Sequence, residues 1–326
     1  MHGRRRTVAR MSIDLPPGAP PEAVRADQYG FAGSATSQRR LIVRRFLRHR
    51  LAVAGTVLFV ALVLVAFFGG LFWKHDYRAL DFTRYQPPSA DHPFGTDKVG
   101  ADMLAQLIRG LQFSLRISLV VALVSTVVGV VLGALAGYLR GWVDSLISRF
   151  IDLLLVVPSL VIVVVLTRST FVTTPNQGSS GGNWLLVALF LSVVGWLSTA
   201  RIVRGCVLSL REKEFVEAAR AMGASTPRIV FRHILPNIAD VIIVNVTLAV
   251  ASAVIAEAAI SFLGLGVRPP DTSLGLLIEQ NRDELSLHPW LFFVPFTVIV
   301  LVSLAVNFIG DGLRDAFDPR QVRSRR

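Results

Sequence analysis

Long apolar runs with almost no charged side chains constrain this chain more than any other feature. The first run, residues 51–73, holds 23 residues without a charge. A helix rises 1.5 Å per residue, so this length crosses the ~30 Å hydrocarbon core of a bilayer. Backbone N–H and C=O groups find no water there, which requires helical structure. With 52% hydrophobic and 17% charged residues, the composition excludes an ordinary soluble domain. The sequence therefore predicts an all-α integral membrane protein.

Six such runs predict six transmembrane helices. They cover residues 51–73, 117–138, about 144–166, 184–203, 238–263 and 289–309. Pro158 lies inside the third run and is expected to kink it. Asp152 follows Arg149 by three residues in the same run, which favours an ion pair within that helix.

These spans divide the chain into segments of different character. They are an Arg- and Pro-rich segment (1–50), the first transmembrane helix (51–73), an extracytoplasmic segment (74–112), a five-helix core with a polar loop at 204–236 (113–310), and a tail (311–326). The front part of the first segment has too little apolar surface to form a core, and we expect it to be flexible. A flexible loop is expected at residues 167–183.

Positive charge is concentrated on one side of the predicted membrane. If the amino terminus is inside, the inside segments hold most of the 34 Lys and Arg residues, eleven of them in residues 1–50. This asymmetry predicts that both termini and the polar loop at 204–236 face the cytoplasm. The net charge of +12 is then an orientation signal and a contact with anionic lipid, and nucleic acid is not expected as a partner.

Two features inside the predicted spans concern packing. Gly129, Gly133 and Gly137 repeat every four residues, a spacing that lets a second helix approach closely. Glu257 lies in the fifth span, where a carboxylate costs roughly 2.5–3.5 kcal/mol near the bilayer centre. It must therefore face protein or a water-filled path. A hydrogen bond to a neighbouring helix near the outer gate is the favoured role, and a place in the pathway or gate is the alternative.

The polar loop has strong internal order over residues 211–236. Its apolar and small residues recur at i, i+3, i+4 and i+7: Phe215, Ala218, Ala219 and Met222. Gly223 follows where a helix would stop, because glycine adopts the left-handed conformation without a Cβ penalty. Thr226 and Pro227 predict the N-cap and first turn of a second short helix, which Pro236 would end. A helix–turn–helix with small side chains exposed at a membrane surface indicates a docking site.

Motifs for catalysis or metal binding do not occur in this sequence. It has no GxxxxGK[ST] phosphate loop, no HExxH, and a single cysteine, Cys206. The six histidines are scattered and are interpreted as surface or interface residues rather than ligands: His2, His49, His75, His92, His233 and His288. We therefore expect no catalytic residue, no metal and no cofactor in this chain.

The loop resembles a known family motif. EAARAMG at residues 217–223 with Leu-Pro at 235–236 is similar to the EAA loop of permease subunits in binding-protein-dependent ABC importers. His233 stands where the general pattern has isoleucine, a departure common in the peptide class. Four further segments resemble the C-type permease of oligopeptide and dipeptide importers: HPFGTDKVGAD (92–102), DLLLVVPS (152–159), SFLGLGVRPPDTSLG (261–275) and GDGLRDAFDP (310–319). The resemblance covers roughly residues 40–320.

This resemblance implies a type I ABC importer permease fold in the plasma or inner membrane of a prokaryote. The implied partners are a homologous B-type permease that forms a heterodimer, one or two cytoplasmic ABC ATPase subunits, and an extracytoplasmic peptide-binding protein. ATP and Mg would be bound by the ATPases, so this chain would not itself be an enzyme. The implied cargo is an oligopeptide; a dipeptide, nickel or another small cargo is the alternative.

The resemblance also implies that the loop couples the permease to the ATPases. The residues assigned to this role are Glu214, Phe215, Glu217, Ala218, Ala219, Met222, Gly223, His233, Leu235 and Pro236. The alternative is a merely solvated helix on which Lys213 and Arg220 pair with Glu217. A stand-alone secondary transporter is a remote alternative, because it predicts inverted repeats with broken helices that this sequence does not show.

Overall fold

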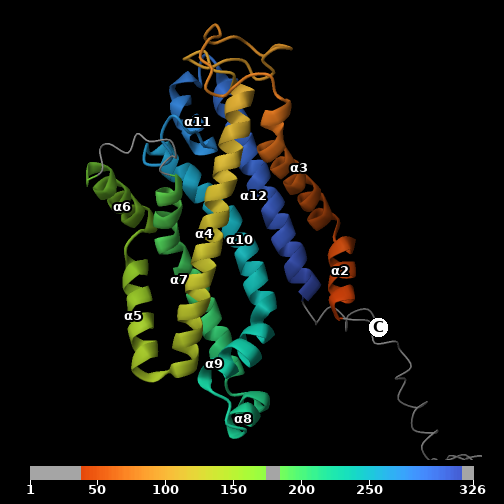
Figure 1. Cartoon of the computed structure of the whole chain (residues 1–326), viewed down its shortest axis with the longest axis vertical. Helices are drawn as coiled ribbons and strands as arrows, with labels where there is room; N and C mark the ends of the chain where they lie inside the picture. The colour runs from red at the N-terminus through yellow and green to blue at the C-terminus, as the bar shows by residue number, and fades with distance from the viewer. Residues whose placement is uncertain (1–37, 174–183, 318–326) are drawn as a thin grey trace, which may run out of the picture. The chain divides into compact units, whose positions relative to one another are not determined.

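The computed structural model describes residues 38–173 and 184–317, and all regular elements in these ranges are helical (Figure 1). The chain divides into two units, residues 1–41 and 42–326, and the second contains the helix bundle. Most of the predicted amino-terminal segment, most of the loop at 167–183 and the end of the tail lie outside the described residues.

Helices make up most of the described residues. In chain order they are α2 (Gln38–Arg48), α3 (Arg50–Phe72), α4 (Met103–Leu139), α5 (Gly141–Val156), α6 (Ser159–Thr173), α7 (Trp184–Leu210), α8 (Glu214–Ala221), α9 (Thr226–Arg228), the π-helical turn η1 (Ile229–Ile234), the 3₁₀ turn η2 (Leu235–Ile238), α10 (Ala239–Phe262), α11 (Leu274–Gln280), the 3₁₀ turn η3 (Arg282–Glu284) and α12 (Pro289–Phe317). The longest described connection lies between α3 and α4.

The helices long and apolar enough to cross a membrane match the predicted spans. Within the described residues they are α3, α4, α7, the helical run that ends with α10, and α12. The bent pair α5–α6 makes a sixth if its two halves form one span. The protein is therefore an all-helical multi-pass membrane protein.

The third span is broken rather than kinked. Its two helices, α5 and α6, meet at an angle of 85°. Val157 between them is extended, with φ −85° and ψ 127°, because a following proline disfavours the helical conformation. Pro158 also has no N–H to continue the hydrogen-bond ladder of α5. Together these effects end α5 and let α6 start in a new direction.

Helix α4 is longer than its apolar run. It begins at Met103, well before residue 117, because Asp102 caps it by accepting a hydrogen bond from the Ala105 N–H at 2.7 Å. The predicted boundary at residue 113 thus falls inside the helix. Helix α12 likewise continues to Phe317, past the predicted end of the last span at residue 309. Both helices extend beyond the segment that apolar composition marks.

Glycines of α4 permit its close contact with α7. A Cβ at Gly129 would come within 2.6 Å of the Thr199 Cβ, and one at Gly133 within 2.5 Å of the Ala200 carbonyl oxygen. Real Cβ atoms do not approach this closely, so the two backbones could not meet if these residues carried side chains. Gly137 makes a third such contact with α7, where a Cβ would lie 2.8 Å from that of Val207.

Ion pairs join α5 to α7. The Asp144 carboxylate accepts two hydrogen bonds from the Arg204 guanidinium, at 2.5 and 2.8 Å. Asp152 pairs with Arg201 at 2.5 Å. The prediction that Asp152 pairs with Arg149 on the same helix is therefore wrong. The bend after α5 leaves α5 beside α7. Asp152 therefore pairs with Arg201 of the facing helix and not with Arg149 of its own helix.

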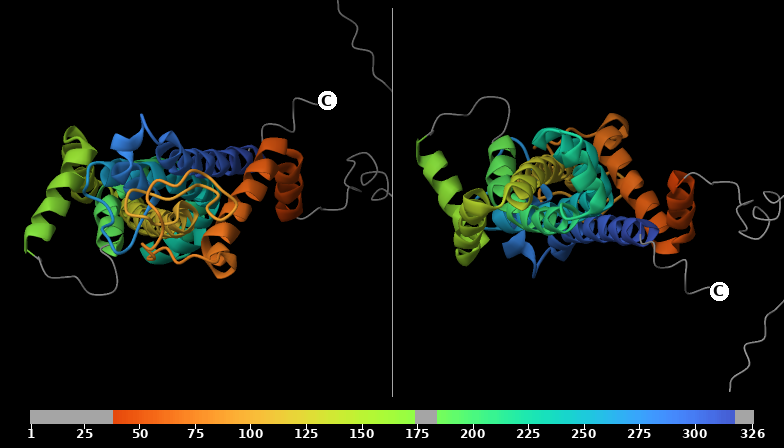
Figure 2. Two further views of the ribbon diagram at one scale, coloured as in Figure 1. Left: turned by 90° about the horizontal axis from the view of Figure 1, so that it is seen from above. Right: turned by 90° about the horizontal axis from the view of Figure 1, so that it is seen from below.

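The helix bundle has two distinct ends (Figure 1). Helix α8 lies at one end, and α11 lies at the other together with the long segment between α3 and α4. The view from above in Figure 2 shows this segment over the end of α4. Hydrogen bonds fix it there: Trp73 Nε1 donates to Asp102 at 2.9 Å, and the Gln106 amide donates to the Tyr77 carbonyl at 2.8 Å.

Candidate functional site

The motif loop forms α8 and ends it with a glycine turn. Gly223 has φ +79°, a conformation that costs a residue with a Cβ roughly 1–2 kcal/mol. The Ala224 N–H donates to the Ala219 carbonyl at 3.1 Å, and the Gly223 N–H donates to the Arg220 carbonyl at 3.0 Å. This pair of bonds is a Schellman motif, which satisfies carbonyls at the helix end. Gly223 thus supplies the sharp turn that its motif position predicts.

The two faces of α8 have different surroundings. Val216 and Ala219 are buried and pack in one cluster with Val203 and Val207 of α7. Next to this buried face, other apolar side chains face out of the protein: Phe215 is 40% exposed, Met222 81%, and Ala218 is exposed as well. Of the four residues predicted to share one face, Ala219 therefore lies against the protein and the other three point away from it.

Glu217 and Glu214 are also exposed, in the first turn of α8, where acidic side chains favourably oppose the helix dipole. Among the residues that the structure describes, no ion pair links Glu217 to Lys213 or Arg220. The Arg220 guanidinium instead lies over the Tyr138 ring, 6.0 Å from its centroid. The outer surface of α8 is thus an apolar strip bordered by two carboxylates.

The second helix of the loop differs from the prediction at both ends. Ser225 occupies the N-cap position, so Thr226 is the first helical residue and Pro227 lies in the first turn. Pro236 does not end the helix. The π-helical turn η1 and the 3₁₀ turn η2 carry it into α10.

The π turn explains how a proline is tolerated here. The Leu235 N–H reaches back five residues to the Val230 carbonyl, which shifts the register of the ladder before Pro236. The Asn237 side-chain amide then donates to the His233 carbonyl at 2.6 Å, in place of a backbone N–H. His233 is half-buried and Pro236 is exposed. The loop is therefore joined to α10 by a continuous helical segment.

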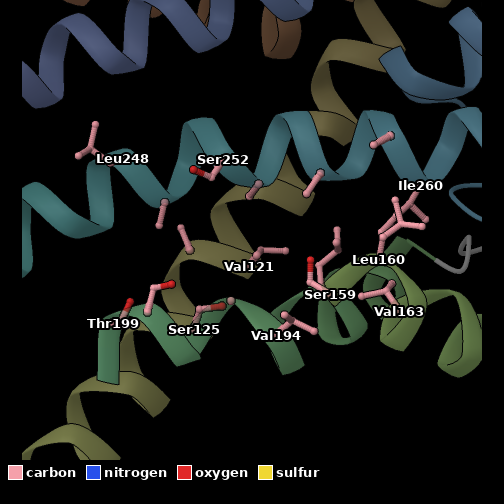
Figure 3. A pocket seen from close by; sticks show the side chains of 18 of the residues that line it. Val121, Ser125, Ser159, Leu160, Val163, Val194, Thr199, Leu248, Ser252 and Ile260 are labelled. Atoms are coloured by element: carbon pink, nitrogen blue, oxygen red, sulfur yellow. The ribbon is translucent and has the colours of Figure 1, made fainter. Parts of the chain in front are cut away.

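A cavity of about 440 Å³ lies between α4, α6, α7 and α10 (Figure 3). Its polar lining consists of hydroxyl and amide side chains, among them Ser125, Ser159, Thr199, Asn245 and Ser252. The Asn245 amide donates to the Thr199 hydroxyl at 2.8 Å. The remaining lining is aliphatic or glycine, and no charged side chain of the described residues contributes. Sequence reasoning missed this cavity, because small and hydroxyl residues within apolar runs have no distinctive spacing.

Glu257 lies on α10 away from this cavity. Its neighbours Ala256 and Ala259 line the cavity, whereas Glu257 does not. Its side chain is completely buried and accepts hydrogen bonds from the hydroxyls of Ser114 at 2.9 Å and Ser261 at 2.7 Å. In the structure, Glu257 therefore connects α10 to α4.

Ser114 also holds α11, an element that the sequence analysis missed. The Leu274 N–H donates to the Ser114 hydroxyl, and the Leu276 N–H donates to the Ser273 hydroxyl, both at 3.1 Å. A Cβ at Gly275 would lie 2.7 Å from the Ala258 Cα, so α11 packs directly on α10. The only sequence signal is the motif SFLGLGVRPPDTSLG, which contains Ser273 and Gly275 but not Ser114.

Comparison with known proteins matches residues 129–323 to the family described as binding-protein-dependent transport system inner membrane component. Residues 37–88 match the N-terminal TM domain of oligopeptide transport permease C. The oligopeptide transport system permease protein OppC of Mycobacterium tuberculosis is 42% identical over 291 residues, which are 89% of this chain and 97% of the relative.

Two further relatives have similar coverage. OppC of Escherichia coli is 40% identical over 280 residues, 85% of this chain and 89% of the relative. The dipeptide transport system permease protein DppC of Alkalihalophilus pseudofirmus is 36% identical over 306 residues, which are 94% of this chain and 95% of the relative. Among solved structures, an inward-facing form of the MetNI methionine ABC transporter matches with a TM-score of 0.55 and 22% identity, covering 66% of this chain and 98% of that one. This last likeness shows a shared fold.

Proposed function

The chain belongs to the family of inner-membrane components of binding-protein-dependent transport systems, and on that premise we propose that it is the C-type permease of an oligopeptide importer. It would form half of the translocation pathway, and a homologous B-type permease would form the other half. An extracytoplasmic binding protein would deliver the peptide. One or two cytoplasmic ABC ATPases would bind ATP and Mg, while this chain hydrolyses nothing.

The observation that carries this proposal is the outer surface of α8. Phe215 and Met222 are large apolar side chains exposed next to the carboxylates of Glu214 and Glu217. Exposing such an apolar strip to water is unfavourable, and placing the two carboxylates beside it in lipid is unfavourable as well. A protein partner with an apolar cleft and basic residues would satisfy both. We assign that partner as an ATPase, which places α8 and both termini in the cytoplasm.

The elements behind α8 suit a mechanical coupling role. Val216 and Ala219 fix α8 to the end of α7, and the helical segment from Thr226 to Phe262 connects it to α10. Both α7 and α10 line the cavity between the spans. A displacement of α8 by an ATPase would therefore reach two walls of the proposed pathway. Gly223, His233, Leu235 and Pro236 would act as the joint between α8 and α10.

The uncharged lining of the cavity suits peptide cargo. Hydroxyl and amide groups can exchange hydrogen bonds with a passing peptide backbone, and the absence of charged lining avoids discrimination between acidic and basic side chains. Relatives named for oligopeptide and for dipeptide transport both align over most of the chain. Uptake of labelled peptides of graded length by the reconstituted complex would separate these two cargo classes. Nickel in the same assay would test the remaining alternative.

The coupling proposal is tested in the complete importer reconstituted in liposomes. Glu217→Ala and Gly223→Pro are expected to reduce peptide-stimulated ATP hydrolysis at least tenfold while the purified permease pair stays folded. Arg228→Ala is the matched control, because Arg228 is also exposed in this loop but lies outside the motif. If both motif variants hydrolyse ATP as the wild type does and assemble normally, the coupling assignment is wrong.

Crosslinking locates the partner directly. In a Cys206→Ala background the chain has no other cysteine, so a cysteine placed at Met222 is unique. Short bifunctional reagents should join it to the ATPase, whereas a cysteine placed at Leu71, which is 78% exposed at the far end of α3, should give no such product. The neighbouring reading frames offer an independent check, since a second permease, Walker-motif ATPases and an exported binding protein are expected there.

A further inference from the structure

Three side chains with metal-ligating chemistry meet at the α11 end of the bundle, remote from α8. His75 follows α3, His92 lies in the segment between α3 and α4, and Asp102 is the N-cap of α4. Each offers one ligand atom, and these atoms all lie within 4.8 Å of one another. His92 and Asp102 are the first and last residues of the segment HPFGTDKVGAD, but their spacing from each other and from His75 matches no short metal-binding motif.

Asp102 orients the His92 ring. The carboxylate is fully buried, and one of its oxygens accepts hydrogen bonds from Trp73 Nε1 and the Ala105 N–H. Its other oxygen lies 2.6 Å from His92 Nδ1. Before an ion binds, this contact fixes the direction of the ring.

His75 has a buried nitrogen with no hydrogen-bond partner among the residues that the structure describes. Its ring stacks on that of His92, with centroids 4.8 Å apart and an interplanar angle of 23°. Phe82 packs edgewise against both rings, at 4.7 and 4.6 Å. In this enclosure His75 Nε2 is buried and unpaired, an arrangement that ordinarily costs about 1–3 kcal/mol. A metal cation that bound the lone pair of this nitrogen would remove this cost.

We propose that His75, His92 and Asp102 bind one divalent transition-metal ion. Two imidazole nitrogens and a carboxylate oxygen suit Zn²⁺, and they also accept Co²⁺ or Ni²⁺. Zinc bonds to such atoms are about 2.0–2.1 Å long, so the side chains must adjust by small rotations, and the hydrogen bond between His92 Nδ1 and Asp102 must give way to the ion. Water would complete the coordination shell.

The bound ion would act as a structural link. It would join the end of α3, the following segment and the start of α4, which are otherwise held by hydrogen bonds and ring contacts. The chain has one cysteine and so cannot make this link with an internal disulfide. This role is separate from transport coupling, and metal binding can be measured on the permease chain whether or not the proposed cargo is correct.

The test uses the full chain, purified through an affinity tag that contains no histidine, stripped with a chelator and titrated with Zn²⁺ and then Co²⁺. Calorimetry should show one high-affinity ion per chain, and bound Co²⁺ should give a visible absorption spectrum of low-coordinate nitrogen and oxygen ligation. His75→Gln should weaken binding at least tenfold. Among the described residues His75 Nε2 makes no hydrogen bond, so this variant gives up ring contacts but no hydrogen bond of that atom and tests the site even if His92→Gln fails to fold.

His288→Gln is the matched control, because this histidine lies at the same end and bonds to Glu284 rather than to the cluster. It should bind the ions as the wild type does. Zn²⁺ should also raise the thermal unfolding temperature of the wild type and of His288→Gln, but not that of His75→Gln. Two results overturn the proposal: a wild type that binds no ion at micromolar concentration, or a His75→Gln chain that binds as tightly as the wild type.

Discussion

Ser114 of α4 donates a hydrogen bond to the buried carboxylate of Glu257 on α10 across 2.9 Å. The same hydroxyl accepts the Leu274 N–H, which begins α11. One serine therefore connects three helices whose residues are far apart in the chain. Removing it would leave both a carboxylate oxygen and a backbone N–H without this partner.

We predict that Ser114→Ala destabilises the protein by about 1–3 kcal/mol, the cost of buried polar groups left unsatisfied. The measurement is the free energy of unfolding of the purified chain in detergent. Ser209→Ala is the control, because Ser209 bonds only to the Cys206 carbonyl at an exposed position and its loss should be close to neutral. Equal effects of the two substitutions would contradict a special role for the Glu257 network.

Gly133→Ala should disrupt the contact between α4 and α7. The added methyl group would lie 2.5 Å from the Ala200 carbonyl oxygen, so the helices must separate, at a cost of about 1–3 kcal/mol typical of overpacking. The effect is measured as a lowered unfolding temperature and reduced yield of the folded chain. Gly205→Ala makes the same chemical change on α7, where nothing lies within 4 Å, and should leave stability unchanged or slightly raised.

The Asp144–Arg204 pair should show strong coupling in a double-mutant cycle. Its two hydrogen bonds are partly buried between α5 and α7, and residues in such contact couple by about 0.5–3 kcal/mol. The cycle uses Asp144→Asn, Arg204→Gln and the double variant, with unfolding free energies from detergent titration. The pair Arg140–Glu212 is more exposed and should give only about 0–1 kcal/mol in the same experiment. A coupling no larger for Asp144–Arg204 than for this surface pair would refute the prediction.

The Tyr85–Glu284 contact should make one end of the bundle sensitive to acid. The Tyr85 hydroxyl donates to Glu284 at 2.7 Å, and this bond, together with the nearby His288, lowers the pKa of the Glu284 carboxyl below its ordinary value. The ionised carboxylate is therefore favoured in the folded state. The stability that the ionised Glu284 carboxylate contributes is fully present above the ordinary pKa of a carboxyl group. It is lost as the pH falls through the lowered pKa that Glu284 has in the folded state.

Amide hydrogen exchange of residues 281–290 as a function of pH measures this effect. Tyr85→Phe removes the hydrogen bond that contributes most to lowering the pKa of Glu284. The exchange protection of this segment should therefore depend less on pH in the acidic range. Tyr77→Phe is the control, since the Tyr77 hydroxyl accepts a bond from Arg78 and does not contact Glu284. The idea fails if Tyr85→Phe and wild type lose protection along the same pH curve.

The sequence alone determined the features that follow from local chemistry. Uninterrupted apolar runs such as residues 51–73 require helices in a bilayer, because backbone groups there can bond only within the segment. Gly223 marked the end of α8, because glycine adopts the left-handed backbone conformation at little cost and other residues do not. The motif around Glu217 identified the family, which the comparisons then showed. The roles of the individual motif residues remain predictions.

Only the tertiary structure decided which residues meet across helices. Asp152 has an arginine three residues away, yet it pairs with Arg201, because the break at Pro158 leaves α5 beside α7. Short helix α11 has too little sequence pattern to be recognised, and it is held by hydroxyls from α4 and from its own cap. His75, His92 and Asp102 come together because the segment between α3 and α4 folds back over the start of α4. Such contacts depend on the direction of each helix in space, which local sequence does not encode.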